Sequence, residues 1–524
     1  MTRRKMAAAA TLAACGMALA SCATSGGAED GGGGDGSKTD KKTTVTARYS
    51  ADPTTYDPAH VSGMDDYSTA RLLYDTVVRY DTDGTIVPGL ATSWETTATG
   101  GVFTIGDHGT CGDGTKITPS IVADSLSYLA APETASGLKA LAFGSGEVTV
   151  TSDDAAGTVT IEVSEPFSGL LAGLVNPATG IICPAGLADV EALKSSPDPA
   201  AFSGPFTLAS AKPGVSYEFE LRDEYVWGDW QEKLEGEAPE KLIFSVGVDT
   251  TATENEIKGG TLDVGLISLA NVSDFPNTAA IEVGENFIVF NESEHSPFRD
   301  PELRRAVAAL LSPQDYSEIT AAGLDPVNYT TGSDALACAN TDPSLVQPYD
   351  PEPVIESGIL QGVQITYSAS NLFGPNGAGA EYVYQQLVAA GAEVTYNLRD
   401  NSTWAAEVLG PDPTTWDITL FGTVNNAVSL WTPLSRMVGL PIEEGGRNMT
   451  RGDNAVGDQL AIEVMAANSQ EEMCALYQDL QEQLLERVDF VPLVSSILYY
   501  GLTEHVRYTG AAGHDDLTTI RIVG

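Results

Sequence analysis

The sequence predicts a mixed α/β protein with at least two lobes. The chain has 524 residues, whereas a single domain usually holds about 100 to 200. Between residues 359 and 421, strand-like and helix-like segments alternate, which is the pattern of a parallel sheet covered by helices. The chain shows no internal repeat with a period of about 20 to 50 residues, so a repeat architecture is not expected.

Hydrophobic periodicity predicts the elements in chain order. Alternating residues predict strands at 45–49, 85–94, 101–105, 147–150, 158–163, 204–221 and 241–248. Apolar residues three and four apart predict helices at 65–80, 119–129 and 303–311. The later strands are expected at 363–367, 393–398 and 416–421, and the later helices at 380–390, 455–467 and 470–488. In helix 303–311 we expect Arg304 and Arg305 on the outer side.

The charge balance excludes several functions. The chain carries 72 acidic and 27 basic residues, a formal net charge of −45, and no basic cluster is visible. Such a surface repels nucleic acid, which is therefore not an expected partner. With 42% hydrophobic residues, the chain can bury a core, so a disordered acidic chain is also excluded.

The amino terminus has the pattern of a secretory signal. Three basic residues at positions 3–5 precede an apolar stretch at 6–20, which is too short to cross a bilayer of about 30 Å as a helix. The next residues, Leu19-Ala20-Ser21-Cys22, resemble the lipobox of bacterial lipoproteins, in which the cysteine is diacylated after cleavage. An ordinary signal peptide with a chance cysteine is the alternative.

The lipobox resemblance implies three amino-terminal parts. Residues 1–21 are expected to be a signal peptide, and Cys22 is expected to carry the lipid. Residues 22–44 are rich in glycine, serine, aspartate and lysine and are expected to form a flexible tether. Beyond them, no stretch reaches the length of about 18 apolar residues that a membrane span requires.

The sequence shows no catalytic constellation. The serine-hydrolase elbow, the phosphate-binding loop with its lysine and the zinc motif H-E-x-x-H are absent. The five histidines stand singly. The loop at 374–379 (Gly-Pro-Asn-Gly-Ala-Gly) is interpreted as the entry to a helix. We therefore expect a protein that is not an enzyme, with no cofactor, metal or catalytic residue.

Several motifs occur in a fixed order between residues 44 and 510. They are Thr-Thr-Tyr-Asp-Pro-Ala at 54–59, Leu-Tyr-Asp-Thr-Val-Val-Arg-Tyr at 73–80, Val-Pro-Gly-Leu-Ala-Thr-Ser-Trp at 87–94, Cys-Gly-Asp-Gly-Thr-Lys-Ile-Thr at 111–118, Ser-Gly-Pro-Phe at 203–206, Phe-Ile-Val-Phe-Asn at 287–291 and Pro-Phe-Arg-Asp-Pro-Glu-Leu-Arg-Arg-Ala at 297–306. In order and spacing they resemble the family 5 extracellular solute-binding proteins, the peptide- and nickel-type receptors of bacterial ABC importers.

This resemblance implies a periplasmic-binding-protein-like type II bilobal fold with an extra domain inserted in lobe I, similar to cluster C. The implied boundaries are lobe I at 45–74, 200–284 and 489–524, the inserted domain at 75–199, and lobe II at 285–488. In this family the ligand lies between lobes that close by a hinge motion.

The resemblance also implies residues of the ligand cleft. One wall is expected to hold Tyr56, Met64 and Asp65, and the other Trp404, Thr423, Asn425 and Asn426. Peptide-binding members carry an aspartate that pairs with the ligand ammonium, and Asn426 stands at that position. Because a neutral amide cannot offer the charge-assisted bond, sugars, opines, metal chelates and other small polar solutes stay open beside peptides.

Four cysteines, at 111, 183, 338 and 474, follow the predicted tether. They lack the spacing of a metal site, so disulfides are favoured over free buried thiols. Of the three pairings that four cysteines allow, Cys111 with Cys183 and Cys338 with Cys474 is favoured, because the implied architecture places each pair within one lobe.

The resulting hypothesis is a lipid-anchored receptor on the outer face of the cell membrane. It would capture an oligopeptide or similar small polar solute and deliver it, as a monomer, to ABC permease subunits with their ATPases. Two alternatives are a lipid-anchored enzyme that acts on peptides or cell-wall fragments, and a ligand sensor on the same fold.

Overall fold

A ten-stranded mixed sheet runs through the part of the chain that the structure describes. The computed structural model describes residues 42–332, 336–424, 429–511 and 514–524. Cys22, Asn425 and Asn426 lie outside these residues. The strand order is β14-β13-β15-β12-β16-β11-β1-β10-β9-β8. These strands are β1 (Thr44–Tyr49), β8 (Phe206–Lys212), β9 (Ser216–Leu221), β10 (Lys241–Val246), β11 (Val264–Leu266), β12 (Thr278–Phe290), β13 (Gln364–Ser370), β14 (Glu393–Arg399), β15 (Ile418–Val424) and β16 (Phe490–Leu502).

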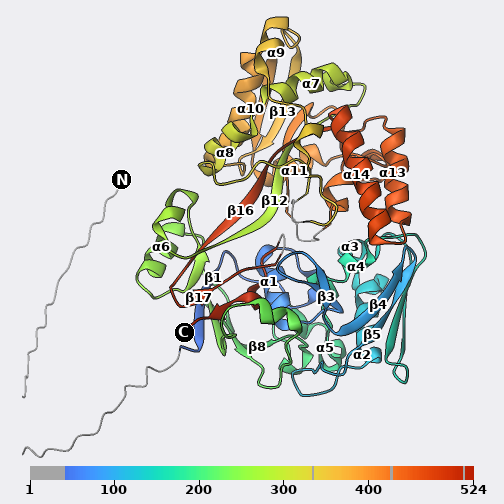
Figure 1. Cartoon of the computed structure of the whole chain (residues 1–524), viewed down its shortest axis with the longest axis vertical. Helices are drawn as coiled ribbons and strands as arrows, with labels where there is room; N and C mark the ends of the chain where they lie inside the picture. The colour runs from blue at the N-terminus through green and yellow to red at the C-terminus, as the bar shows by residue number, and fades with distance from the viewer. Residues whose placement is uncertain (1–41, 333–335, 425–428, 512–513) are drawn as a thin grey trace, which may run out of the picture. The chain divides into compact units, whose positions relative to one another are not determined.

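The long strands β12 and β16 connect two halves of this sheet (Figure 1). We call β11-β1-β10-β9-β8 the first half and β14-β13-β15 the second half. β12 pairs antiparallel with β16 and, over residues 284–290, also with β15. β16 pairs over residues 500–502 with β11. The β12–β16 register shifts between Glu282 and Gly284, so Val283 is a bulge residue where the sheet passes from one half to the other.

The first half carries a separate four-stranded sheet, β4-β5-β7-β6. Thr118 caps α2, because its hydroxyl accepts a bond from the backbone N–H of Ile121, and Pro119 occupies the first turn. The elements here are α1 (Met64–Leu73), β2 (Val78–Tyr80), β3 (Ile86–Pro88), β4 (Ala91–Thr97), β5 (Gly100–Ile105), α2 (Pro119–Ala130), α3 (Lys139–Phe143), β6 (Val148–Asp153), β7 (Thr158–Val163), α4 (Leu170–Gly173), α5 (Pro184–Ala188) and α6 (Thr250–Lys258).

The second half confirms the predicted alternation of strands and helices. β13 pairs in parallel with both β14 and β15, and helices connect these strands. The helices are α7 (Pro301–Leu310), α8 (Pro313–Ala321), α9 (Pro351–Ser357), α10 (Ala378–Ala389), α11 (Asn401–Val408), α12 (Trp431–Leu434), α13 (Ala455–Ala466) and α14 (Gln470–Arg487). After β16, two short strands, β17 (Val506–Arg507) and β18 (Arg521–Ile522), pair with each other.

Two predicted elements are shorter than expected. The helix predicted at 65–80 ends at Leu73, because the β-branched residues that follow favour an extended backbone, and β2 pairs with β3 instead. The strand predicted at 85–94 is interrupted at Gly89 and Leu90, between the end of β3 at Pro88 and the start of β4 at Ala91. A Cβ at Gly89 would lie 2.4 Å from the carbonyl oxygen of Thr76, so only glycine fits this close approach.

The prediction for Arg304 is wrong. Its side chain is 2% exposed, and its guanidinium lies 3.0 Å from Glu292 and 3.3 Å from Asp489. A second arginine, Arg487, contacts the same two carboxylates. Arg304 is thus part of a buried ion network between α7 and the start of β16, while Arg305 lies on the exposed face with Glu302.

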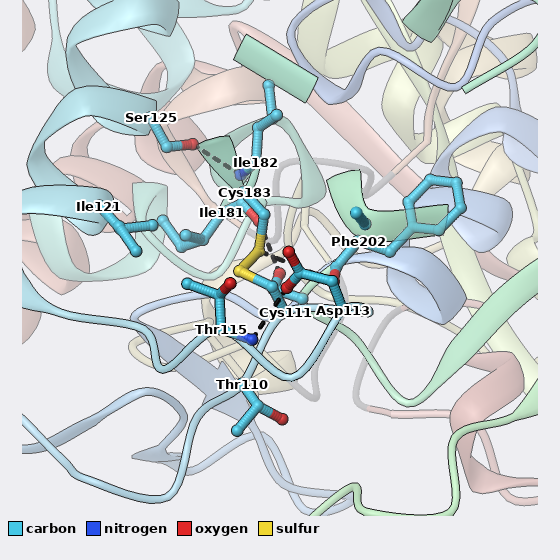
Figure 2. The surroundings of a disulfide bond; sticks show 12 residues. Thr110, Cys111, Asp113, Thr115, Ile121, Ser125, Ile181, Ile182, Cys183 and Phe202 are labelled. Atoms are coloured by element: carbon cyan, nitrogen blue, oxygen red, sulfur yellow. Dashed lines mark hydrogen bonds between the residues drawn. A yellow bond between two sulfur atoms is a disulfide. The ribbon is translucent and has the colours of Figure 1, made fainter. Parts of the chain in front are cut away.

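Two disulfides have the pairing that the sequence analysis favours. Cys111 is bonded to Cys183 with a Cα–Cα separation of 5.9 Å, and Cys338 to Cys474 with 4.6 Å. Figure 2 shows the first bond beside the hydrogen bond that the Ile182 N–H donates to the Ser125 hydroxyl. The disulfide between Cys111 and Cys183 joins the loop before α2 to the loop before α5.

Within the described ranges, no helix combines the length and the apolar character that crossing a bilayer requires.

Candidate functional site

A cavity lies between the two halves of the sheet, beside the bulge of β12. It has a volume of about 330 Å³, including space open to solvent. Its walls come from α1, from the bulge residue Val283, from Val424 at the end of β15, and from residues 514–515 near the carboxy terminus. We call this space the central cavity. Its lining residues are Met64, Tyr67, Ser68, Arg71, Val283, Val424, His514 and Asp515.

One face of α1 forms the first wall of the central cavity. Met64, Tyr67, Ser68 and Arg71 line it, and their spacing of three and four residues places them on one side of a helix. The opposite side anchors the helix, because Leu72 and Leu73 are fully buried. Asp66 fixes the first turn by accepting hydrogen bonds from Thr54 and Ser62.

Arg71 brings a positive charge to this wall. Its side chain is half-buried, and burial lowers its pKa to about 10. It also lines a neighbouring cavity of about 380 Å³, together with Arg79 and Asp516. Among the described residues, its guanidinium has no hydrogen-bond or ion-pair partner.

Asp515 is the carboxyl group of the central cavity. Its Oδ2 atom accepts hydrogen bonds from Ser68 and Tyr500, each at 3.1 Å. Its Oδ1 atom is buried and has no hydrogen-bond partner among the residues that the structure describes. Burial raises the pKa of Asp515 to about 7, because the charged form loses its hydration. Near neutral pH this group therefore titrates.

Asp516 behaves differently from its neighbour. Burial alone would raise its pKa, but the charges of Arg79 and Arg71 lower it. Arg79 lies 2.8 Å away, and Thr518 donates from both its backbone N–H and its hydroxyl. Asp516 is thus an ionised carboxylate whose charge is already compensated.

The pKa of Asp515 predicts a pH-dependent stability. Between about pH 4 and pH 7 the folded protein holds a proton that the unfolded chain has lost, so stability falls as pH rises through this window. Asp515→Asn keeps the acceptor for Ser68 and Tyr500 but cannot ionise. The difference in unfolding free energy between this variant and wild type is expected to grow by about 3 kcal/mol, in favour of the variant, as the pH rises from 5 to 8. Thermal unfolding measures it. The control is Asp107→Asn at an exposed position, and an equal gain in both variants would contradict the assignment.

The structure places the predicted residues of the first wall as follows. Met64 lines the central cavity, and with Asp65 it also lines a third cavity of about 350 Å³. Asp65 accepts hydrogen bonds from the hydroxyl of Ser50 and the N–H of Ala51. Tyr56 is only 6% exposed and packs in the core of the first half, where its backbone carbonyl accepts a bond from Tyr74.

The predicted residues of the second wall are separated. Thr423 precedes the cavity residue Val424 and donates a hydrogen bond to the buried Glu285. Trp404 is 6% exposed and packs against Phe421 in the core, so the structure does not bring it to the cavities described above. Asn425 and Asn426 lie outside the described residues.

Sequence reasoning predicted Met64 but missed the other seven residues of the cavity, namely Tyr67, Ser68, Arg71, Val283, Val424, His514 and Asp515. The helical spacing from Met64 was a signal for the three on α1. Nothing local connects residues 514 and 515 with α1, because more than 440 residues of chain separate them. In the described ranges, no cluster of three or more His, Cys, Asp or Glu side chains has the geometry of a metal site.

Comparisons with known proteins agree with this architecture. The sequence model of the bacterial extracellular solute-binding proteins, family 5, matches residues 85–439. A substrate binding protein from Microbacterium hydrocarbonoxydans, solved in complex with 4-hydroxybenzoate hydrazide, is 36% identical and has a TM-score of 0.75. That comparison covers 92% of this chain and 100% of the other.

More distant relatives were also found. Di/tripeptide-binding protein 2 of Pseudomonas aeruginosa is 21% identical over 86% of this chain and 89% of its own. NikA from Brucella suis, solved with Fe(III)-EDTA, is 18% identical with a TM-score of 0.74, over 92% of this chain and 100% of the other. The predicted type II periplasmic-binding-protein fold is confirmed, and the chain belongs to the family 5 bacterial extracellular solute-binding proteins.

Proposed function

We propose that this protein is the receptor of an ABC importer and captures a small solute in the central cavity. The family and the structural neighbours are solute-binding proteins rather than enzymes. The observation that carries the proposal is the origin of the cavity walls, since α1 belongs to the first half and Val424 to the second. A ligand that touches both walls stabilises the arrangement in which they face each other.

A contact outside the sheet also supports this mode of action. The hydroxyl of Ser168 donates to the carbonyl of Val464 at 2.6 Å, and its N–H donates to Met465 at 3.0 Å. Ser168 belongs to the proposed inserted domain at 75–199, whereas both acceptors lie on α13 in the proposed lobe II at 285–488. Lobe I is proposed to comprise 45–74, 200–284 and 489–524. This contact is far from β12 and β16 in the chain. It therefore gives the proposed inserted domain and the proposed lobe II a point of attachment besides these two strands.

Two relatives favour small ligands. The relative at 36% identity was solved with a small aromatic hydrazide, and a more distant one is called a di/tripeptide-binding protein. We propose dipeptides or small aromatic acyl compounds as the ligand class, rather than long peptides.

A thermal-shift screen of the purified protein tests the receptor function. The panel contains dipeptides, 4-hydroxybenzoate hydrazide, oligosaccharides and metal chelates. A true ligand at about 100 times its dissociation constant stabilises the folded state by about 2.7 kcal/mol. Stabilisation by at least one small solute without its turnover is expected. Turnover that a single substitution abolishes would instead favour an enzyme.

The lipid anchor proposed at Cys22 has its own test. Cys22→Ser removes the thiol that would be acylated, and two acyl chains are what stable membrane attachment requires. We expect the wild-type protein in the membrane fraction and the variant in the soluble fraction of the producing cells. An equal distribution of both proteins, measured by immunoblotting, would contradict the anchor.

A further inference from the structure

The central cavity contains a cation, Arg71, that has no counter-ion among the described residues. Two other arginines have carboxylate partners, since Arg79 pairs with Asp516 and Arg304 with Glu292 and Asp489. Arg71 is half-buried like Arg79, yet no carboxylate among the described residues lies within 4 Å of its guanidinium. In a chain with 72 acidic residues, this arrangement is notable, because a desolvated charge without a partner is costly.

The acidic groups near Arg71 do not compensate its charge. Asp516 is held by Arg79 at 2.8 Å and by Thr518. Asp515 is held by hydroxyl donors, and burial keeps part of its population protonated near neutral pH. His514, another cavity residue, is 5% exposed. Asp75, which lines the neighbouring cavity with Arg71, accepts a hydrogen bond from the Tyr225 hydroxyl at 2.7 Å. These carboxyl groups are thus held by other donors.

The rest of the cavity wall is mainly apolar. Met64, Val283 and Val424 line it together with the ring of Tyr67. Such a surface packs against an aliphatic or aromatic body. Beside it, the buried Oδ1 atom of Asp515 has no hydrogen-bond partner within the described ranges, so the same cavity also offers an acceptor for one N–H or O–H group.

We propose that Arg71 binds the carboxylate of the transported solute, whose apolar body packs against Met64, Val283 and Val424. The substrate class is then a small monocarboxylate with an aromatic or aliphatic body. The planar guanidinium matches a carboxylate through two parallel hydrogen bonds. A dianion such as phosphate fits less well, because Asp516 carries a charge nearby. This inference rests on the receptor function proposed above.

Two matched pairs of probes separate the carboxylate from the body that carries it. The first pair is 4-hydroxybenzoate and 4-hydroxybenzamide, and the second is alanyl-phenylalanine and its carboxy-terminal amide. Calorimetric titration of the purified full-length protein measures their affinities. We expect at least one acid to bind tenfold or more tightly than its amide, as charge-assisted hydrogen bonds imply.

Variants of Arg71 then assign the preference to this side chain. Arg71→Gln is expected to remove the difference between acid and amide, and Arg71→Lys to retain part of it through its charge. Arg305→Gln on the exposed face of α7 is the matched control and should keep the full preference. Circular dichroism and thermal unfolding verify that the variants fold. If Arg71→Gln does not fold, the test rests on Arg71→Lys.

The outcomes distinguish this inference from the receptor function. Equal affinities of acid and amide, or a preference that persists in Arg71→Gln, overturn the role of Arg71. Binding of neutral solutes from the wider panel without binding of either acid also overturns it but leaves the receptor function intact. Failure of every solute to bind overturns both.

Discussion

Replacing Arg304 with methionine is expected to destabilise the protein by about 3 to 5 kcal/mol, the usual effect of breaking a buried ion pair. The guanidinium is 2% exposed, and besides Glu292 and Asp489 it donates to the backbone carbonyls of Val488 and Phe298. Methionine removes one donor from each of these groups. The two carboxylates then share only Arg487.

The destabilisation should increase with pH. Burial and the charge of Asp489 raise the pKa of Glu292 to about 8, while Arg304 acts against this increase. Without Arg304, the carboxyl groups of Glu292 and Asp489 hold their protons more strongly. Low pH therefore protonates them and relieves their mutual repulsion, whereas high pH ionises them and restores it. Urea unfolding at pH 6 and pH 9 measures the difference.

Arg305→Met is the control for this prediction. Arg305 is the next residue on α7, is exposed and pairs with Glu302 at 2.8 Å, so its loss should change stability by less than about 1 kcal/mol. Equal losses from both variants would show that the ion network does not stabilise the fold.

Removal of the disulfide between Cys111 and Cys183 is expected to lower the stability of the first half by about 4 kcal/mol. The bond closes a loop over 72 residues, and constraint of the unfolded chain contributes about this amount for such a loop. It also holds the loop before α2 near the carbonyl oxygen of Ala201, to which the N–H of Cys183 donates.

The double variant Cys111→Ala/Cys183→Ala, compared with Cys338→Ala/Cys474→Ala, measures this effect by calorimetry. Each double variant should lower the midpoint temperature of the unfolding transition of the part of the chain that held the removed disulfide. Wild-type protein treated with a reductant should reproduce both shifts. Unchanged transitions in the first double variant would contradict a stabilising role.

Local sequence patterns predicted much of the fold. The alternation of strands and helices after residue 359 gave β13, β14 and β15 with their parallel pairing. The spacing of apolar residues at 119–129 predicted α2. Such patterns depend on neighbours within a few residues, where periodicity and backbone preference suffice. The ordered motifs pointed to the family that the comparisons then showed.

Candidate site residues were harder to predict. Met64 was predicted and lines the central cavity, whereas Trp404 was predicted on the opposite wall and packs in the core. An aromatic residue has the same local pattern in both positions. Only the packing of Phe421 against its ring decides between them.

By itself, the sequence determined the fold class, the family, the acidic character of the chain and the spacing that puts Met64 and Arg71 on one face of a helix. The tertiary structure alone decided which charges meet. It buried Arg304 among carboxylates, paired Arg79 with Asp516 and left Arg71 beside Asp515 with no ion pair to any described residue. The physical reason is that electrostatic interactions depend on distance and burial in space, and these partners are far apart in the chain.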